Sequence, residues 1–163
     1  MKIILLLFLS ITIYAQEYKL IEDAKTEKLM LVGISTRDAF QDSNFSNWFN
    51  EEYENYEVDT NLVNQHKSEI VDKKIKIILG TWCSDSRREV PRFLKVLDFI
   101  GFLDDNLTII NVDRTKNGLS NETAELEIEL VPTIIIYEES EEIGKIIETP
   151  NETLEKDLIE IAD

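Results

Sequence analysis

The second half of the chain alternates short apolar runs with amphipathic stretches. Residues 74–80 (K-I-K-I-I-L-G) and 107–112 predict buried strands, because short runs rich in β-branched residues are typical of strands. Residues 84–100 carry apolar side chains at the spacing of one helix face, namely Val90, Phe93, Leu94, Leu97 and Ile100. Gly101 supplies the end of that helix. The pattern predicts a strand–helix–strand unit of an α/β domain.

Four further elements complete this half. Residues 121–128 predict a short helix, and residues 131–137 (V-P-T-I-I-I-Y) predict a strand entered through a proline. Residues 142–148 predict a second strand, which forms a hairpin with the first across the solvated run E-E-S-E-E at 138–142. Residues 149–161 have apolar positions on one face and predict a C-terminal helix.

The pattern is weaker before residue 74. Residues 61–71 predict a helix capped by Asp59 or Thr60, and residues 29–34 predict a strand. Between them, aromatic residues recur at intervals of four, four and three, at Phe45, Phe49, Tyr53 and Tyr56. This stripe favours the buried face of an amphipathic helix over a ligand site. We therefore predict an N-terminal extension at 16–58, with an aromatic helix, and a main domain at 59–163.

The first residues have the form of a secretory signal. Lys2 precedes an apolar run from residue 3 to 13, and Ala15 offers a small residue for cleavage. A membrane anchor would need about 20 apolar residues, and Gln16 and Glu17 end the run too early. A lipid anchor would need a cysteine where Gln16 stands. We expect a signal peptide at 1–15, no membrane span after its removal, and a periplasmic or secreted protein.

The charge of the chain restricts its partners. Without residues 1–15 it carries 16 basic side chains against 33 acidic ones, a net charge of −17. Phosphate backbones and anionic membrane surfaces attract the opposite sign, and the longest basic clusters are pairs such as Arg87-Arg88. The composition excludes nucleic acid as a partner.

Cys83 is the only cysteine in 163 residues, and it cannot close an internal disulfide. It is buried and inert, joined to another molecule, or kept as a reactive thiol, and composition leaves all three open. The only histidine, His66, stands in a polar helix, where a surface position is favoured over pairing with Cys83. One cysteine and one histidine make no zinc or haem ligand set, so we expect no metal and no cofactor.

Specific residues connect these elements to a known family. Cys83 lies in L-G-T-W-C-S-D-S-R-R-E-V-P at 79–91, where Trp82 precedes it and Pro91 follows eight residues later. The chain also has V-P-T at 131–133, N-V-D at 111–113 and Gly144 in the last predicted strand. Residues 60–163 thereby resemble the thioredoxin family. The resemblance implies a thioredoxin-like fold, with helices on both faces of a central mixed sheet, and a cis peptide bond at Pro132 beside Cys83.

Two departures from the family pattern bear on function. Ser86 stands where the family has its second cysteine, which makes the motif W-C-x-x-S. Ile77 replaces the carboxylate that thioredoxins often carry six residues before the nucleophile. The first departure removes dithiol chemistry, and the second removes a proton acceptor for it.

A thiol at the first turn of a helix faces unpaired backbone N–H groups and the positive end of the helix dipole, which favour the thiolate. Ser86, three residues on, is placed to donate its hydroxyl to the sulfur. Asp85 opposes the anion, whereas Arg87 and Arg88 support it if they fold back. Cys83 and Ser86 are therefore the candidate catalytic residues.

Three hypotheses follow. The first is an exported thioredoxin-like protein, an oxidoreductase without a resolving cysteine, that exchanges a single thiol with proteins or small thiols. By the resemblance, Val131 and Pro132 would hold an extended substrate and Trp82 would flank the groove. The second is a redox-inactive binding or chaperone-like module that uses the same groove. The third is a structural role in an envelope complex through the aromatic helix around Trp48.

Overall fold

A computed structural model describes residues 17–163 of the chain. The predicted signal peptide, residues 1–15, lies outside the described residues. The elements in chain order are β1 Glu17–Glu22, β2 Leu29–Ser35, the short 3-10 helix η1 Arg37–Gln41, α1 Ser46–Asn55, α2 Thr60–Ile70, β3 Lys74–Leu79, α3 Ser84–Ile100, η2 Asp104–Asn106, β4 Leu107–Asn111, β5 Thr133–Glu138, β6 Glu141–Ile147 and α4 Leu154–Ala162.

The strands form one mixed sheet in the order β1-β2-β4-β3-β5-β6. Strands β3 and β4 are parallel, as the connection through α3 requires, and every other neighbouring pair is antiparallel. Ile77 at the centre of β3 pairs with Ile109 of β4 on one side and Ile134 of β5 on the other. The four apolar residues of the run K-I-K-I-I-L are therefore buried, because β3 is an interior strand with covered faces.

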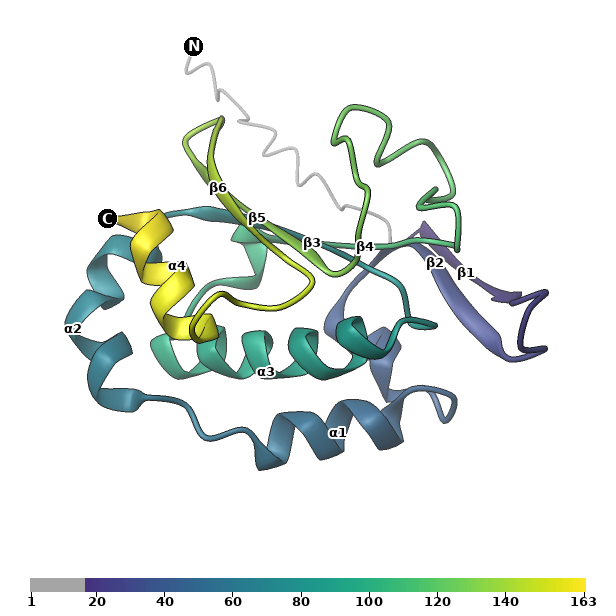
Figure 1. The fold of residues 1–163 in the computed structure, drawn as a ribbon, viewed down its shortest axis with the longest axis horizontal. Helices are drawn as coiled ribbons and strands as arrows, with labels where there is room; N and C mark the ends of the chain where they lie inside the picture. Colours follow the sequence, from purple (N-terminus) through teal and green to yellow (C-terminus); the bar gives the residue numbers. More distant parts are fainter. Residues whose placement is uncertain (1–16) are drawn as a thin grey trace, which may run out of the picture.

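The four α-helices of residues 17–163 lie on one face of the sheet (Figure 1). Ile75, Ile77 and Leu79 of β3 face this side and share a core with side chains from α1, α2, α3 and α4. In Figure 1, α3 lies directly under the sheet and α1 lies beneath α3. Of the two hydrophobic clusters within residues 17–163, this one is the larger, and it anchors α3 from Val90 to Ile100. Cys83 directly precedes this helix.

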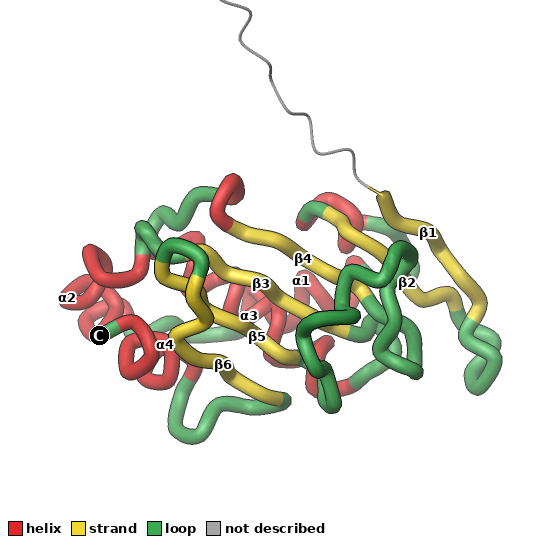
Figure 2. Tube along the Cα trace, turned by 90° about the horizontal axis from the view of Figure 1, so that it is seen from above, coloured by secondary structure: helices red, strands yellow, loops and turns green. Residues whose placement is uncertain are grey.

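The mixed α/β architecture with a central mixed sheet is confirmed, but the expectation of helices on both faces is wrong. Figure 2 shows the loop between β4 and β5 lying over the other face. That face presents Ile78, Ile110 and Ile135, and Leu126 and Ile128 of the loop pack against them. Loop side chains thus cover the apolar surface that a helix was expected to cover.

The predicted helix at 121–128 is likewise wrong, because this segment forms turns. Asn121 and Glu127 have positive φ angles of 61° and 48°, which no α-helix contains. The Thr123 hydroxyl donates to the carbonyl of Lys116 at 2.8 Å, a local bond that holds the chain folded back on itself. The apolar residues of this segment do pack against the sheet, as Leu126 and Ile128 show, but they do so from a loop and not from a helix.

The N-terminal part joins the same sheet. The predicted strand at 29–34 is β2, which pairs with β4. Strand β1 was not predicted, because its six residues are all exposed and give no pattern of burial. The N-terminal segment and the residues after 59 therefore share one sheet and one core, and the boundary at residue 58 stays a prediction.

The aromatic stripe forms the inner face of α1. Phe45 and Phe49 are buried, and Tyr53 and Tyr56 pack against the same core. Trp48 also packs there and lies under the Arg87 guanidinium, 5.8 Å from its ring centroid. These rings contact α3 and the core, which removes the observation that suggested an envelope contact surface.

The remaining helices match the sequence with shifted ends. Helix α2 begins after Asp59, whose side chain accepts a hydrogen bond from the Leu62 amide. Helix α4 begins at Leu154, later than predicted, because Thr153 caps it and Pro150 lies in the preceding turn. Within residues 17–163, no helix is long and apolar enough to cross a membrane.

Candidate functional site

Cys83 stands between β3 and α3, at the N-cap position of the helix. Its backbone is extended, with φ −91° and ψ 131°, and its N–H donates to the carbonyl of Gly80 at 2.9 Å. Its own carbonyl accepts the first helical hydrogen bond, from the Arg87 N–H at 3.1 Å. The side chain is half-buried. The sulfur therefore sits at the positive end of a 17-residue helix, which stabilises negative charge there.

The cysteine meets a segment 48 residues further along the chain. The Val131–Pro132 peptide bond is cis, and the Cys83 thiol donates to the Val131 carbonyl with an Sγ–O distance of 3.2 Å. The Pro132 carbonyl accepts a hydrogen bond from Glu148 N–H at 2.7 Å, which ties this turn to the end of β6. The structure thus brings together the two segments that the sequence singled out.

Trp82 is held beside the cysteine by three contacts. Its indole Nε1–H donates to the Val112 carbonyl at 2.9 Å, just after β4. The Arg114 guanidinium lies over its ring, 4.8 Å from the centroid. Gly80 leaves room for the indole, because a Cβ at that position would stand 2.5 Å from the ring. The ring is fixed by residues from two connections, Gly80 between β3 and α3 and Val112 with Arg114 after β4.

Ser86 has a different partner from the one the sequence suggested. Its side chain is fully buried, and its Oγ accepts a hydrogen bond from the Gly80 N–H at 3.2 Å. No hydrogen bond joins Ser86 to the Cys83 sulfur among the described residues. Ser86 therefore fixes the connection between β3 and α3, where it satisfies a buried backbone donor.

Arg87 and Arg88, near the start of α3, are bound to groups other than the sulfur. Arg87 donates through Nε to the Thr81 carbonyl at 2.5 Å and lies over Trp48. Arg88 pairs with Asp85 at 2.8 Å and with Glu89 at 2.6 Å. The sequence offered these two as support for the thiolate, but their hydrogen bonds commit them to other groups.

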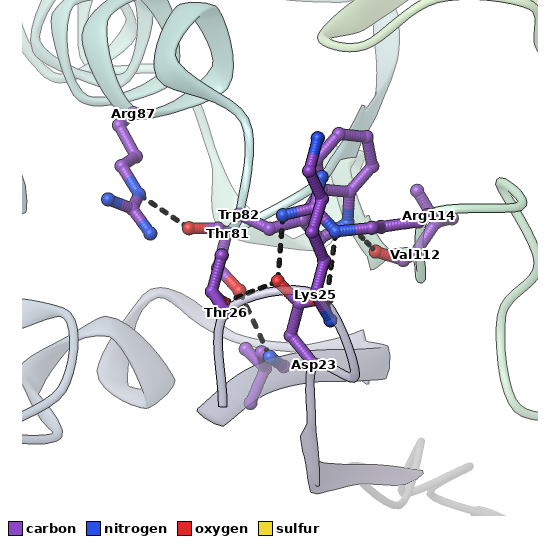
Figure 3. Close-up of polar contacts among 9 residues, drawn as sticks. Asp23, Lys25, Thr26, Thr81, Trp82, Arg87, Val112 and Arg114 are labelled. Carbon is purple, nitrogen blue, oxygen red and sulfur yellow. Dashed lines mark hydrogen bonds and ion pairs between the residues drawn. The ribbon is translucent and has the colours of Figure 1, made fainter. Parts of the chain in front are cut away.

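An ion pair between Asp23 and Arg114, which the sequence did not reveal, borders the site on one side (Figure 3). Arg114 donates through Nε and one terminal nitrogen to the two carboxylate oxygens of Asp23, at 2.8 and 2.7 Å. Asp23 belongs to the turn between β1 and β2 and also accepts from the Thr26 hydroxyl and the Lys25 N–H. The two charged residues are 91 positions apart, so no local pattern in the sequence could have joined them.

These hydrogen bonds hold the pKa of Asp23 well below its usual value of 3.8, and Arg114 contributes most to that shift. The pKa of Arg114 is raised, first by Asp23 and to a lesser degree by negative charge on Cys83. Arg114 is thus electrostatically linked to the cysteine as well as stacked on its neighbour Trp82. The site consists of Trp82, Cys83, Val131 and Pro132, with Asp23 and Arg114 on one side.

The Asp23 carboxylate predicts an acid-dependent stability. A group whose pKa is lower in the folded protein stabilises it above the unfolded pKa, and that contribution is lost as the pH falls below about 4. We expect the free energy of unfolding in urea to fall more steeply from pH 5 to pH 3 in the wild type than in Asp23→Asn. Asp105→Asn, which removes an exposed carboxylate, serves as the control and keeps the wild-type slope. Equal slopes in all three proteins would contradict the prediction.

The residues present suit thiol chemistry. No group of three or more histidine, cysteine, aspartate or glutamate side chains within residues 17–163 is arranged to hold a metal ion. His66 pairs with Glu69 on α2 at 2.7 Å. One surface depression lies between α1 and α3, where Tyr53, Lys95 and Phe99 line it, and it does not include Cys83. The candidate nucleophile of the site is the free thiol of Cys83.

Of the comparisons with known proteins, the one with solved structures bears on this architecture. No protein-family model and no curated protein sequence matches the chain. A crystal structure of a Pseudomonas aeruginosa protein of unknown function is similar, with 15% identity over 79% of this chain and 90% of that one, and a TM-score of 0.52. This similarity concerns the fold alone.

Two thioredoxins in their oxidised state were also found. Thioredoxin O2 from Arabidopsis thaliana has 21% identity over 54% of this chain and 76% of that one, with a TM-score of 0.35. Mitochondrial thioredoxin 3 from Saccharomyces cerevisiae has 20% identity over 59% of this chain and 86% of that one, with a TM-score of 0.34. In this chain, the strand that follows the cis Val131–Pro132 bond pairs with β3, and the Val131 carbonyl meets Cys83 at the start of α3. This topology is thioredoxin-like.

Proposed function

We propose that this protein carries out single-thiol exchange through Cys83, with protein or small-molecule thiols and disulfides as partners. The observation that carries the proposal is the position of the sulfur. It lies at the N-terminus of α3, half-buried and 3.2 Å from the Val131 carbonyl of a distant segment. A helix N-terminus favours the thiolate, which is the form that attacks a disulfide.

The exchange has two steps. The Cys83 thiol gives up its proton to solvent, and the thiolate attacks one sulfur of a partner disulfide. A new S–S bond to Cys83 forms as the partner's S–S bond breaks, and the second partner sulfur leaves as a thiolate. A thiolate from another molecule then attacks the mixed disulfide, and Cys83 leaves as the thiolate. One disulfide is consumed and one is formed, so electrons balance without a cofactor.

The second step requires an outside thiol. Ser86 occupies the position three residues after Cys83, and its hydroxyl is bound to the Gly80 N–H. A serine oxygen cannot displace the partner sulfur to give a stable disulfide. The mixed disulfide on Cys83 therefore persists until an external thiol arrives, and a partner protein can be recovered from it.

A chromogenic disulfide tests this proposal. Neutral 4,4′-dithiodipyridine at pH 7 is expected to release one equivalent of thiopyridone per chain and to leave one pyridyl group on the protein, because Cys83 is the only thiol. Mass spectrometry locates that group, and added thiol removes it. The matched control Cys83→Ala releases none. A wild-type rate no faster than that of the same thiol in the urea-unfolded chain would contradict the proposal.

A second function has one observation in its favour. Leu130 is 44% exposed directly before Val131, and the Cys83 proton is engaged by the Val131 carbonyl. This combination suits a binding module that holds an apolar partner segment with the thiol at rest. Binding of a partner that survives in Cys83→Ala without loss of affinity would favour this function over exchange.

We further propose that the protein is exported, on the form of residues 1–15. Its oxidising destination would then supply disulfide partners. The mature protein recovered from outside the cytoplasm is expected to begin at Gln16. A protein that retains residues 1–15 in the cytoplasm would contradict this part of the proposal.

A further inference from the structure

The Asp23–Arg114 pair presents its two charges unequally. The Asp23 side chain is only 3% exposed, whereas the Arg114 side chain is 31% exposed. A partner that approaches the site therefore meets the guanidinium, while the carboxylate behind it is covered. Arg114 also lies over Trp82, the neighbour of Cys83, and Figure 3 shows it extended across that ring.

Arg114 is better placed than the other arginines near the sulfur. Arg87 and Arg88 are bound to groups of α3 and the connection before it. Asp85, on the first turn of the helix, is partly neutralised by Arg88. Negative charge on Cys83 adds a little to the raised pKa of Arg114, after the larger effect of Asp23. Arg114 therefore offers an exposed positive charge near the site, in a chain whose net charge is −16.

The guanidinium keeps hydrogen-bonding capacity for a ligand. Arginine has five N–H donors, and Asp23 uses one at Nε and one at a terminal nitrogen. The remaining donors can bind a carboxylate, and the ion pair with Asp23 prevents the side chain from leaving its place over Trp82. Asp23 acts here as a support that sets the position of the cation.

On the basis of the proposed function, we propose that Arg114 is a specificity-determining residue that favours thiol and disulfide partners carrying a carboxylate near the reacting sulfur. Trp82 positions it, because the guanidinium lies over a ring that packs against the same apolar cluster as Cys83. Neutral sulfur compounds of the same size react without this attraction. The substrate class is thus anionic, which the acidic surface of the protein as a whole would otherwise disfavour.

A pair of alkylating reagents separates this attraction from the reactivity of the thiol. Iodoacetate and iodoacetamide both lose iodide to the Cys83 thiolate as a C–S bond forms, and they differ by one negative charge. Because the same thiolate attacks both, the ratio of their two rate constants cancels the amount of thiolate present. The ratio is measured at pH 7 and low salt in the wild type, Arg114→Gln, Arg114→Lys and the control Lys116→Gln. The control removes one positive charge from the same loop.

In Arg114→Gln, we expect the iodoacetate-to-iodoacetamide ratio to fall about fivefold, the size of one near charge–charge interaction in water. Arg114→Lys keeps the charge and retains most of the ratio, and Lys116→Gln keeps the wild-type ratio. Added salt reduces the difference between the wild-type ratio and the Arg114→Gln ratio. An unchanged ratio in Arg114→Gln, or an equal loss in Lys116→Gln, would overturn the inference while exchange with 4,4′-dithiodipyridine stands. A thiol that reacts with none of these reagents would overturn both.

Discussion

Ser86→Cys is expected to release two equivalents of thiopyridone from 4,4′-dithiodipyridine, where the wild type releases one. The first equivalent comes from capture of the reagent on Cys83. The introduced thiol then attacks the mixed disulfide from within the same chain, at the high effective concentration of an intramolecular group. Residues three apart at the start of a helix are neighbours on one face, which is the spacing of the Cys-x-x-Cys pairs of disulfide oxidoreductases. Mass spectrometry is expected to find no pyridyl group left on the protein.

Ser84→Cys is the matched control for that experiment. Ser84 is exposed and directly follows Cys83, and neighbouring residues on a helix do not face each other. This variant is expected to release two equivalents as well, but to retain both pyridyl groups. One retained group in Ser86→Cys would contradict the view that serine at this position is what makes the protein a single-thiol exchanger.

Gly80→Ala is expected to have the second large effect, on both stability and the site. The added Cβ would stand 2.5 Å from the Trp82 ring, which cannot move aside without breaking its hydrogen bond to Val112 or its contact with Arg114. Overpacking of this kind costs about 1–3 kcal/mol in the free energy of unfolding. We expect that loss in urea unfolding, together with a shift of the Trp82 indole N–H signal in NMR.

Gly118→Ala provides the comparison for Gly80→Ala. Its added Cβ would meet the carboxylate of Glu122 at 2.2 Å, the end of a flexible side chain that can turn away. The free energy of unfolding is expected to change little, and the Trp82 signal to stay in place. Equal effects of the two substitutions would show that Trp82 is not held as tightly as its contacts indicate.

Local pattern was sufficient for the centre of the fold. The strand at 74–79, the helix at 84–100 and the hairpin of β5 and β6 follow from spacing, because burial on a strand or helix repeats along the chain itself. Pattern failed at residues 121–128 and at β1. In the first, a local hydrogen bond and two positive φ angles replaced a helix. In the second, an exposed edge strand left no burial to detect.

The sequence by itself determined the groups of the candidate site: one cysteine, preceded by tryptophan, at the start of a helix, with serine three residues further on. These are covalent and local facts, readable from spacing. The tertiary structure decided the partners of that cysteine. It placed Val131 at the sulfur, bound Ser86 to Gly80, and set Arg114 over Trp82 with Asp23 behind it. Contacts between residues far apart in the chain depend on how the strands order in the sheet, and no local period records that order.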